Sequence, residues 1–220
     1  MLLRMENKPK VSASIKFLLF FLFIINSAAA LWGPLFSVFV IRNVAGATLA
    51  IIGITSALYS ITKSFLQIPI ARYLDAHVGE KDDFFVLFIG IVIASVCSFA
   101  LLFVAQIWQL GGVQILWGVA DACTMAAYFA IFSHHIDQRS AAFEWSLYSV
   151  GGITISIALG GLVGGFVAES FGFSILFAAA GFMNLGALFV LGAIYPYINP
   201  MRSPKPPADE PVALQATENK

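Results

Sequence analysis

The sequence predicts an all-α membrane protein, and three observations lead to that fold class. Of the 220 residues, 60% are hydrophobic and only 11% are charged, whereas soluble domains are about 45–50% apolar. Six apolar runs are each long enough to cross a bilayer as a helix, which takes about 20 residues. The ~10-residue alternation of polar and apolar residues that marks a membrane barrel is absent. A helix also satisfies its own backbone hydrogen bonds in lipid.

The six expected transmembrane helices are joined by short loops, so consecutive helices are predicted to be antiparallel neighbours. They cover residues 16–41, 45–70, 84–105, 107–132, 141–168 and 172–198. Residues 1–15 are expected to form a cytoplasmic N-terminal segment, and residues 16–198 the transmembrane domain. Residues 199–220 are proline-rich and polar, and they are predicted to form a disordered cytoplasmic tail.

The first apolar run allows a second interpretation, as a secretory signal peptide. It has a basic start, a short apolar core from Phe17 to Ile25 and small residues in an A-x-A spacing. Cleavage after Ala30 would leave five spans. Because the apolar run continues through LWGPLFSVFVI to a full bilayer length, we favour a first helix that is kinked at Gly33 and Pro34.

The basic residues predict the orientation, because Lys and Arg near span ends resist translocation. With six spans and both termini inside, Arg42 falls outside and Lys63 lies within a span. The other ten basic residues are cytoplasmic: Arg4, Lys8, Lys10, Lys16, Arg72, Lys81, Arg139, Arg202, Lys205 and Lys220. We therefore expect an integral protein of the plasma (inner) membrane with cytoplasmic N- and C-termini.

Two charged residues lie inside the predicted spans and mark a candidate substrate path. Asp121 is near the middle of 107–132, and Lys63 lies in 45–70 at a similar depth. A charge at mid-bilayer costs at least ~2.5–3.5 kcal/mol, so it usually faces a cavity or a partner. Paired, the two form a neutral structural tie. Unpaired, Asp121 can take a coupling proton or a cationic substrate, and Lys63 an anion.

Other polar residues of the spans can contribute to the same cavity or make ordinary interhelical hydrogen bonds. They are Asn26, Gln67, Thr124 and Tyr128. The sequence therefore predicts a small-molecule or ion substrate without naming it.

Enzyme chemistry is not indicated. No histidine lies at membrane depth to activate a serine nucleophile, as an intramembrane protease requires. The aspartates of a D-x-x-D-G phosphatidyltransferase motif are absent, and so is a G-x-x-x-x-G-K-[ST] phosphate loop. We expect no cofactor, no metal site and no nucleic-acid partner.

The loop between the second and third spans resembles a motif of the major facilitator superfamily, G-x-x-x-D-[RK]-x-G-[RK]-[RK]. The matching residues are Asp75, Gly79 and Lys81, with Ala71 in place of the first glycine. Ala76 replaces the basic residue after the aspartate, and one extra residue separates Asp75 from the glycine.

The fifth span resembles the superfamily pattern G-x-x-x-G-P-x-x-G-G in the stretch SIALGGLVGG, residues 156–165. Gly160, Gly164 and Gly165 fall on that pattern, while Gly161 stands in the place of the proline and Ser156 in that of the first glycine. Small residues four apart allow helices to approach closely in lipid, so these four glycines are predicted to form a helix-packing face.

The resemblance covers residues 16–198 and implies a transporter built from a six-helix half with 3+3 repeats. Relatives of this kind normally have two such halves around a substrate site at mid-membrane. One half alone leaves that site open to lipid. We therefore expect a half-size transporter that acts as a parallel homodimer in the bilayer. The alternative is a non-transporting membrane subunit or assembly factor, or the truncated half of a longer transporter.

In the resembled family the loop aspartate braces the cytoplasmic gate against the second half. The corresponding partner of Asp75 is the fifth span of the other copy, which begins near Ser140, a plausible N-cap residue. The alternative is a solvated loop whose charges only enforce topology. The predicted gate residues are Asp75, Gly79, Lys81, Arg139 and Glu144.

Overall fold

The computed structural model describes residues 11–77 and 79–197, and within these ranges the chain is helical with no β-strand. The all-α prediction is therefore confirmed. The elements are α1 (Ala13–Trp32), η1 (Gly33–Leu35), α2 (Phe36–Asn43), α3 (Leu49–Ala76), α4 (Lys81–Ala100), η2 (Leu101–Phe103), α5 (Ile107–His135), α6 (Ala141–Leu147), η3 (Tyr148–Thr154), α7 (Ile155–Ile194) and η4 (Tyr195–Tyr197). The predicted tail 199–220 and most of the predicted segment 1–15 lie outside the described residues.

In the part of the chain that the structure describes, five continuous helical stretches are long and apolar enough to cross a membrane. They are Ala13–Asn43, Leu49–Ala76, Lys81–Phe103, Ile107–His135 and Ala141–Ile194. In the first of these, the 3-10 turn η1 joins α1 to α2 at Gly33 and Pro34, the two residues predicted to kink it. The continuous stretch itself agrees with a helix that extends past Ala30.

The last stretch is too long for a single crossing. Its 54 residues would measure about 81 Å at ~1.5 Å per residue, against a hydrocarbon core of ~30 Å. Gly172 interrupts it, with φ +82° and ψ 174°, a conformation that glycine adopts readily and other residues do not. Nearer its start, η3 is a π-helical turn, in which the Thr154 hydroxyl donates to the Ser149 carbonyl at 3.0 Å.

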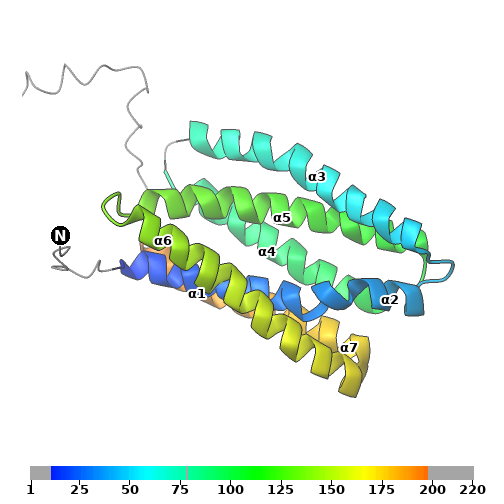
Figure 1. Ribbon diagram of the computed structural model, residues 1–220. Coiled ribbons are helices and arrows are strands. Elements are labelled where there is room, and N and C mark those ends of the chain that lie inside the picture. Colours follow the sequence, from blue (N-terminus) through cyan, green and yellow to red (C-terminus); the bar gives the residue numbers. More distant parts are fainter. Residues whose placement is uncertain (1–10, 78, 198–220) are drawn as a thin grey trace, which may run out of the picture.

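The chain reverses direction at Gly172. Before this residue, Gly164 lies against Leu31 near the end of α1. After it, the chain returns until the Tyr195 ring packs on Phe84, at the start of α4, with centroids 5.1 Å apart. In Figure 1 the yellow part of the ribbon descends along the front of the bundle and the orange part runs back behind α1.

The helices form an elongated bundle in which α3 occupies one edge (Figure 1). α3 packs mainly on α5, α4 packs on both α5 and α7, and α1 packs on α7. In the most apolar part of α3 only 6% of residues are buried, against 39–56% in the other four stretches. One face of α3 is therefore uncovered by the other described residues.

Among the described residues, two apolar cores fill the bundle. We call the end where α1 begins and α5 ends the near end, and the opposite end, with α2 and η2, the far end. The near-end core includes Leu18, Leu87, Tyr128, Phe132 and Leu191. The far-end core includes Trp32, Phe39, Leu101, Leu110 and Phe177. The residues between the two cores are the more polar ones described below.

The four glycines of the predicted packing face divide into two pairs. A Cβ at Gly164 would lie 2.9 Å from the Cα of Leu31, and one at Gly160 would lie 2.7 Å from a backbone carbonyl oxygen of α1. A Cβ at Gly161 would make an ordinary 3.6 Å contact, and one at Gly165 would meet nothing within 4 Å. The close approach of α7 to α1 thus depends on Gly160 and Gly164.

Gly164→Ala should destabilise the protein because the added methyl group collides with the backbone of α1. We expect a loss of about 1–3 kcal/mol, the usual cost of overpacking. Gly165→Ala is the matched control: it adds the same methyl group one residue away in open space, and should be neutral or slightly stabilising. Thermal unfolding in micelles, followed by circular dichroism, measures both. Equal losses in the two variants would contradict the assignment.

Candidate functional site

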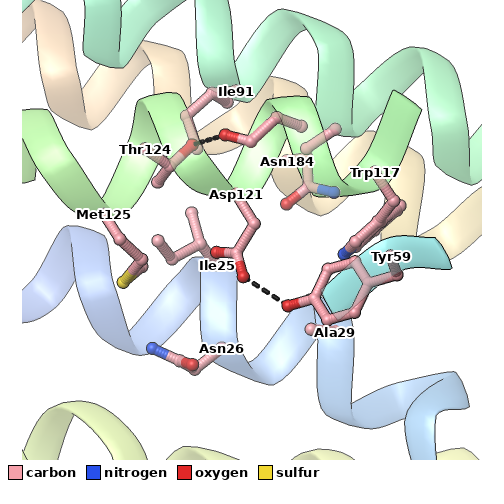
Figure 2. Close-up of a pocket in the computed structure, with 12 residues that line it drawn as sticks. Ile25, Asn26, Ala29, Tyr59, Ile91, Trp117, Asp121, Thr124, Met125 and Asn184 are labelled. Atoms are coloured by element: carbon pink, nitrogen blue, oxygen red, sulfur yellow. Dashed lines mark hydrogen bonds between the residues drawn. The ribbon is translucent and has the colours of Figure 1, made fainter. Parts of the chain in front are cut away.

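A cavity of about 200 Å³ lies between the two apolar cores. It exceeds the ~10–15 Å³ that one water needs and falls below the ~300–1,000 Å³ of sites for drug-sized ligands. Five helices supply its walls (Figure 2), through Ile25, Asn26, Ala29, Tyr59, Ile91, Ala94, Trp117, Ala120, Asp121, Thr124, Met125 and Asn184. Its size suits a small molecule or a small ion.

An ion pair stands at one wall of the cavity. Lys63 Nζ lies 2.6 Å from Asp121 Oδ2, and the Tyr59 hydroxyl donates to the same oxygen at 2.5 Å. Tyr59 and Lys63 are four residues apart, so α3 presents both on one face. Of the two arrangements that the sequence allows, the structure has the paired one. The pair is not sealed, since the Lys63 and Asp121 side chains are 31% and 21% exposed.

Two glycines bring these helices close enough to meet. A Cβ at Gly118 of α5 would lie 2.7 Å from the Tyr59 carbonyl oxygen. On another side of α5, a Cβ at Gly90 of α4 would lie 2.9 Å from the Ala120 carbonyl oxygen. Any larger residue at these points would push α3 or α4 away from Asp121. The sequence analysis missed both glycines, because nothing in the sequence distinguishes them among the 18 glycines of the chain.

Polar side chains of α1, α5 and α7 complete the lining. The Asn26 amide donates to the Leu22 carbonyl at 3.0 Å, and the Thr124 hydroxyl donates to the Ala120 carbonyl at 2.8 Å. Asn184 is almost fully buried and donates to Ser98 Oγ at 3.3 Å. The sequence analysis named Asn26 and Thr124 but missed Asn184, although it is the single amide side chain in the predicted span 172–198.

The structure does not bring Gln67 and Tyr128 to the cavity. Gln67 lies one turn beyond Lys63 on α3, and the Tyr128 hydroxyl lies 3.4 Å from the Leu18 carbonyl inside the near-end core. Two aromatic residues that the sequence analysis passed over line the cavity instead, Tyr59 and Trp117. Each precedes a charged residue by four positions, a spacing that places side chains on one helix face.

The predicted gate residues gather at the near end. Asp75 is exposed in the last turn of α3, and Lys81 is exposed at the start of α4. Gly79, between these helices, has φ +111°, so this turn favours glycine.

Glu144 is buried and binds the loop that follows α5. Its carboxylate accepts the Asp137 backbone N–H and the Ser140 hydroxyl, each at 3.2 Å. Asp137 in turn accepts the backbone N–H of Arg139 at 2.9 Å. Ser140 directly precedes α6, but its hydroxyl bonds to Glu144 and makes no cap hydrogen bond. Ser140 is thus the N-cap residue of α6, as predicted, but the Glu144 carboxylate competes for its hydroxyl.

A second near-end contact was not predicted. Glu80, which is 2% exposed, lies beside His135, with 3.8 Å between Glu80 Oε1 and His135 Nδ1. It joins the start of α4 to the end of α5.

The fold and the site together define an α-helical membrane protein with a polar, ion-paired cavity inside its bundle. The chain matches the Major Facilitator Superfamily over residues 17–218, most of its length. It therefore belongs to this superfamily, whose members are transporters, and the resemblance seen in the loop and glycine motifs is confirmed. No curated protein matches the chain in a comparison of sequences.

A double-mutant cycle tests the ion pair. Lys63→Met and Asp121→Leu should each destabilise the protein, because each leaves a charge without its partner in the membrane. We expect a cost between the ~1 kcal/mol of exposed pairs and the ~3–5 kcal/mol of buried ones. The double variant should lose less than the sum of the two.

Unfolding free energies in micelles measure the cycle. Arg42→Met, which removes an exposed charge at the far end, is the control and should have little effect. Strictly additive losses at Lys63 and Asp121 would show that the pair contributes no coupling.

Proposed function

We propose that this protein is a secondary transporter of a small solute that works by alternating access, and that it is half-size and acts as a parallel homodimer. The observation that carries the proposal is the ion-paired cavity between the two cores of a major facilitator bundle. Substrate sites in such folds lie near mid-membrane, between two halves.

The proposed topology has six crossings in a 3+3 arrangement, with the last helical stretch divided at Gly172. The reversal of the chain at that residue supports two crossings there. The near end carries Lys16, Arg72, Lys81 and Arg139, whereas Arg42 lies at the far end. By the positive-inside rule, the near end and both termini are cytoplasmic, in a plasma (inner) membrane.

The uncovered face of α3 supports the homodimer. It exposes large apolar side chains, including Ile54, Ile61, Phe65 and Ile68, and Lys63 is 31% exposed beside them. A helix whose charged residue would otherwise be close to lipid gains from a second protein surface. A second copy placed against α3 would supply what the second half supplies in twelve-span relatives.

The charge pair supports a transport role over a purely structural one. Water weakens the attraction within an exposed ion pair, so a pair that served only stability would gain little from access to a cavity. Here both partners are partly exposed and Asp121 lines an open cavity. A solute or proton can therefore reach the carboxylate and compete with Lys63.

Reconstitution into liposomes tests the transport proposal. A panel of small solutes, screened with and without a pH gradient, should reveal one whose uptake needs the protein. Asp121→Asn keeps the shape of the side chain and should lower that uptake at least tenfold, since it removes the only acidic group of the described cavity lining.

The oligomeric state is measured on the same vesicles by cross-linking. A monomer that remains active would overturn the homodimer. If no solute is moved and a partner with six further spans co-purifies, the alternative holds: a membrane subunit, an assembly factor or half of a longer transporter.

Asp75 is proposed to act as a latch. In the closed cytoplasmic state its carboxylate meets the start of the helical stretch Ala141–Ile194 of the other copy. A carboxylate at a helix N-terminus gains ~0.3–1 kcal/mol. Asp75→Asn should therefore change the ratio of inward-open to outward-open molecules about two- to fivefold.

Accessibility labelling from each side of the membrane reads this ratio. Asp82→Asn, which removes a nearby carboxylate of α4 outside the loop motif, is the control. Identical populations in the wild type and Asp75→Asn would leave the loop with topology as its single role.

A further inference from the structure

Four polar side chains around the cavity have a common property: each donates a hydrogen bond inside the protein and keeps an oxygen that can accept another. Thr124 donates to Ala120, and Tyr59 donates to Asp121. Once its proton is committed, a hydroxyl oxygen can only accept further hydrogen bonds. Both hydroxyls therefore offer acceptors to anything that enters the cavity.

The two amides have the same polarity, and chemistry fixes their orientation. Asn26 faces a backbone carbonyl, which can only accept, so its NH₂ group must point there. Asn184 faces Ser98 Oγ, whose own proton is donated to the Ala94 carbonyl at 3.0 Å. Ser98 must therefore accept, and Asn184 must donate. Each amide is left with its carbonyl oxygen and one N–H for the cavity.

Asp121 adds a charged acceptor. Both of its protein donors, Lys63 and Tyr59, converge on Oδ2. Within the described part of the chain, Oδ1 accepts no hydrogen bond. Figure 2 shows the carboxylate with one oxygen bonded to Tyr59 and the other turned away from it, on the side of Ile25 and Asn26.

The cavity offers little to an anion. Lys63 does not line it, because its ammonium group lies against Oδ2 at the wall. Among the described lining side chains, the donors that no protein acceptor uses are uncharged: the indole N–H of Trp117 and the second N–H of each amide. Trp117 and Tyr59 also supply aromatic faces, which attract cations.

We propose that the cavity binds a small organic cation whose charged group carries several N–H donors, that is, an ammonium or guanidinium ion. Asp121 Oδ1 anchors the charge, and the carbonyl oxygens of Asn26 and Asn184 accept the remaining N–H groups. Because Lys63 shares the carboxylate, the bound cation competes with it electrostatically. This inference rests on the proposed function and names its substrate class.

Four small probe compounds distinguish the effect of the ligand's charge on binding from the effect of its N–H donors. Guanidinium, urea and nitrate are planar and similar in size, but they are cationic, neutral and anionic. Tetramethylammonium is a cation without N–H groups. Calorimetric titration of the purified protein at constant ionic strength should give the tightest binding for guanidinium, with the other three at least tenfold weaker. Tightest binding by nitrate or urea, or equal binding of the two cations, would overturn the proposal.

Substitution of one amide at a time tests the acceptors. Asn26→Leu and Asn184→Leu keep side-chain size and should each weaken guanidinium binding about tenfold, as expected for a lost hydrogen bond to a charged group. Asn43→Leu is the matched control. Like Asn26, Asn43 donates to the carbonyl four residues earlier at 3.0 Å, but it lies at the end of α2, away from the cavity.

Asn184 is buried, so its replacement by leucine can prevent folding. The affinity of Asn184→Leu is therefore compared only if circular dichroism shows that the variant is folded. Asn26 is half-buried, and Asn26→Leu provides the second test. Unchanged affinity in folded Asn26→Leu would overturn the proposed acceptor set. If guanidinium binds but no solute is transported, the proposed transport function is contradicted and the proposed cation site is supported. If other solutes are transported but guanidinium does not bind, the transport function is supported and the cation site is contradicted.

Discussion

A carboxylate inside a membrane bundle must be compensated, and the arrangement around Asp121 follows from this constraint. Lys63 supplies the countercharge and Tyr59 a strong donor, and both come from the same face of α3. The backbones of α3 and α5 must then lie close enough for these side chains to reach Asp121, and Gly118 permits this close approach. Charge compensation and close helix packing are therefore one requirement at this site.

The two apolar cores give this polar layer its position. Each core closes one end of the bundle with large side chains such as Phe132 and Phe177, and the layer between them holds the polar residues of the cavity. The position of the cavity therefore depends on the packing of both cores. The open side of the layer, at α3, is where residues 11–77 and 79–197 provide no cover.

The sequence was sufficient to predict the helical membrane class, the superfamily and a possible pairing of Asp121 with Lys63, because lipid makes charges in a span rare and conspicuous. It could not rank Asn184, Tyr59 and Trp117 above other polar or aromatic residues, since their role depends on which faces of different helices meet. Tyr128 and Gln67 illustrate the same difficulty: each has a suitable side chain, but its helix face turns it elsewhere.

The π-helical turn Tyr148–Thr154 has a consequence for how the glycine pattern is interpreted. Hydrogen bonds to the fifth preceding residue wind the chain less tightly than an α-helix does. Residues after the turn therefore point in a different direction from the one that an uninterrupted 3.6-residue period, counted from Ala141, would give. The turn sets the rotational phase of the second part of the helix. Through that phase, Gly160 and Gly164, and not their neighbours Gly161 and Gly165, make the closest contact with α1.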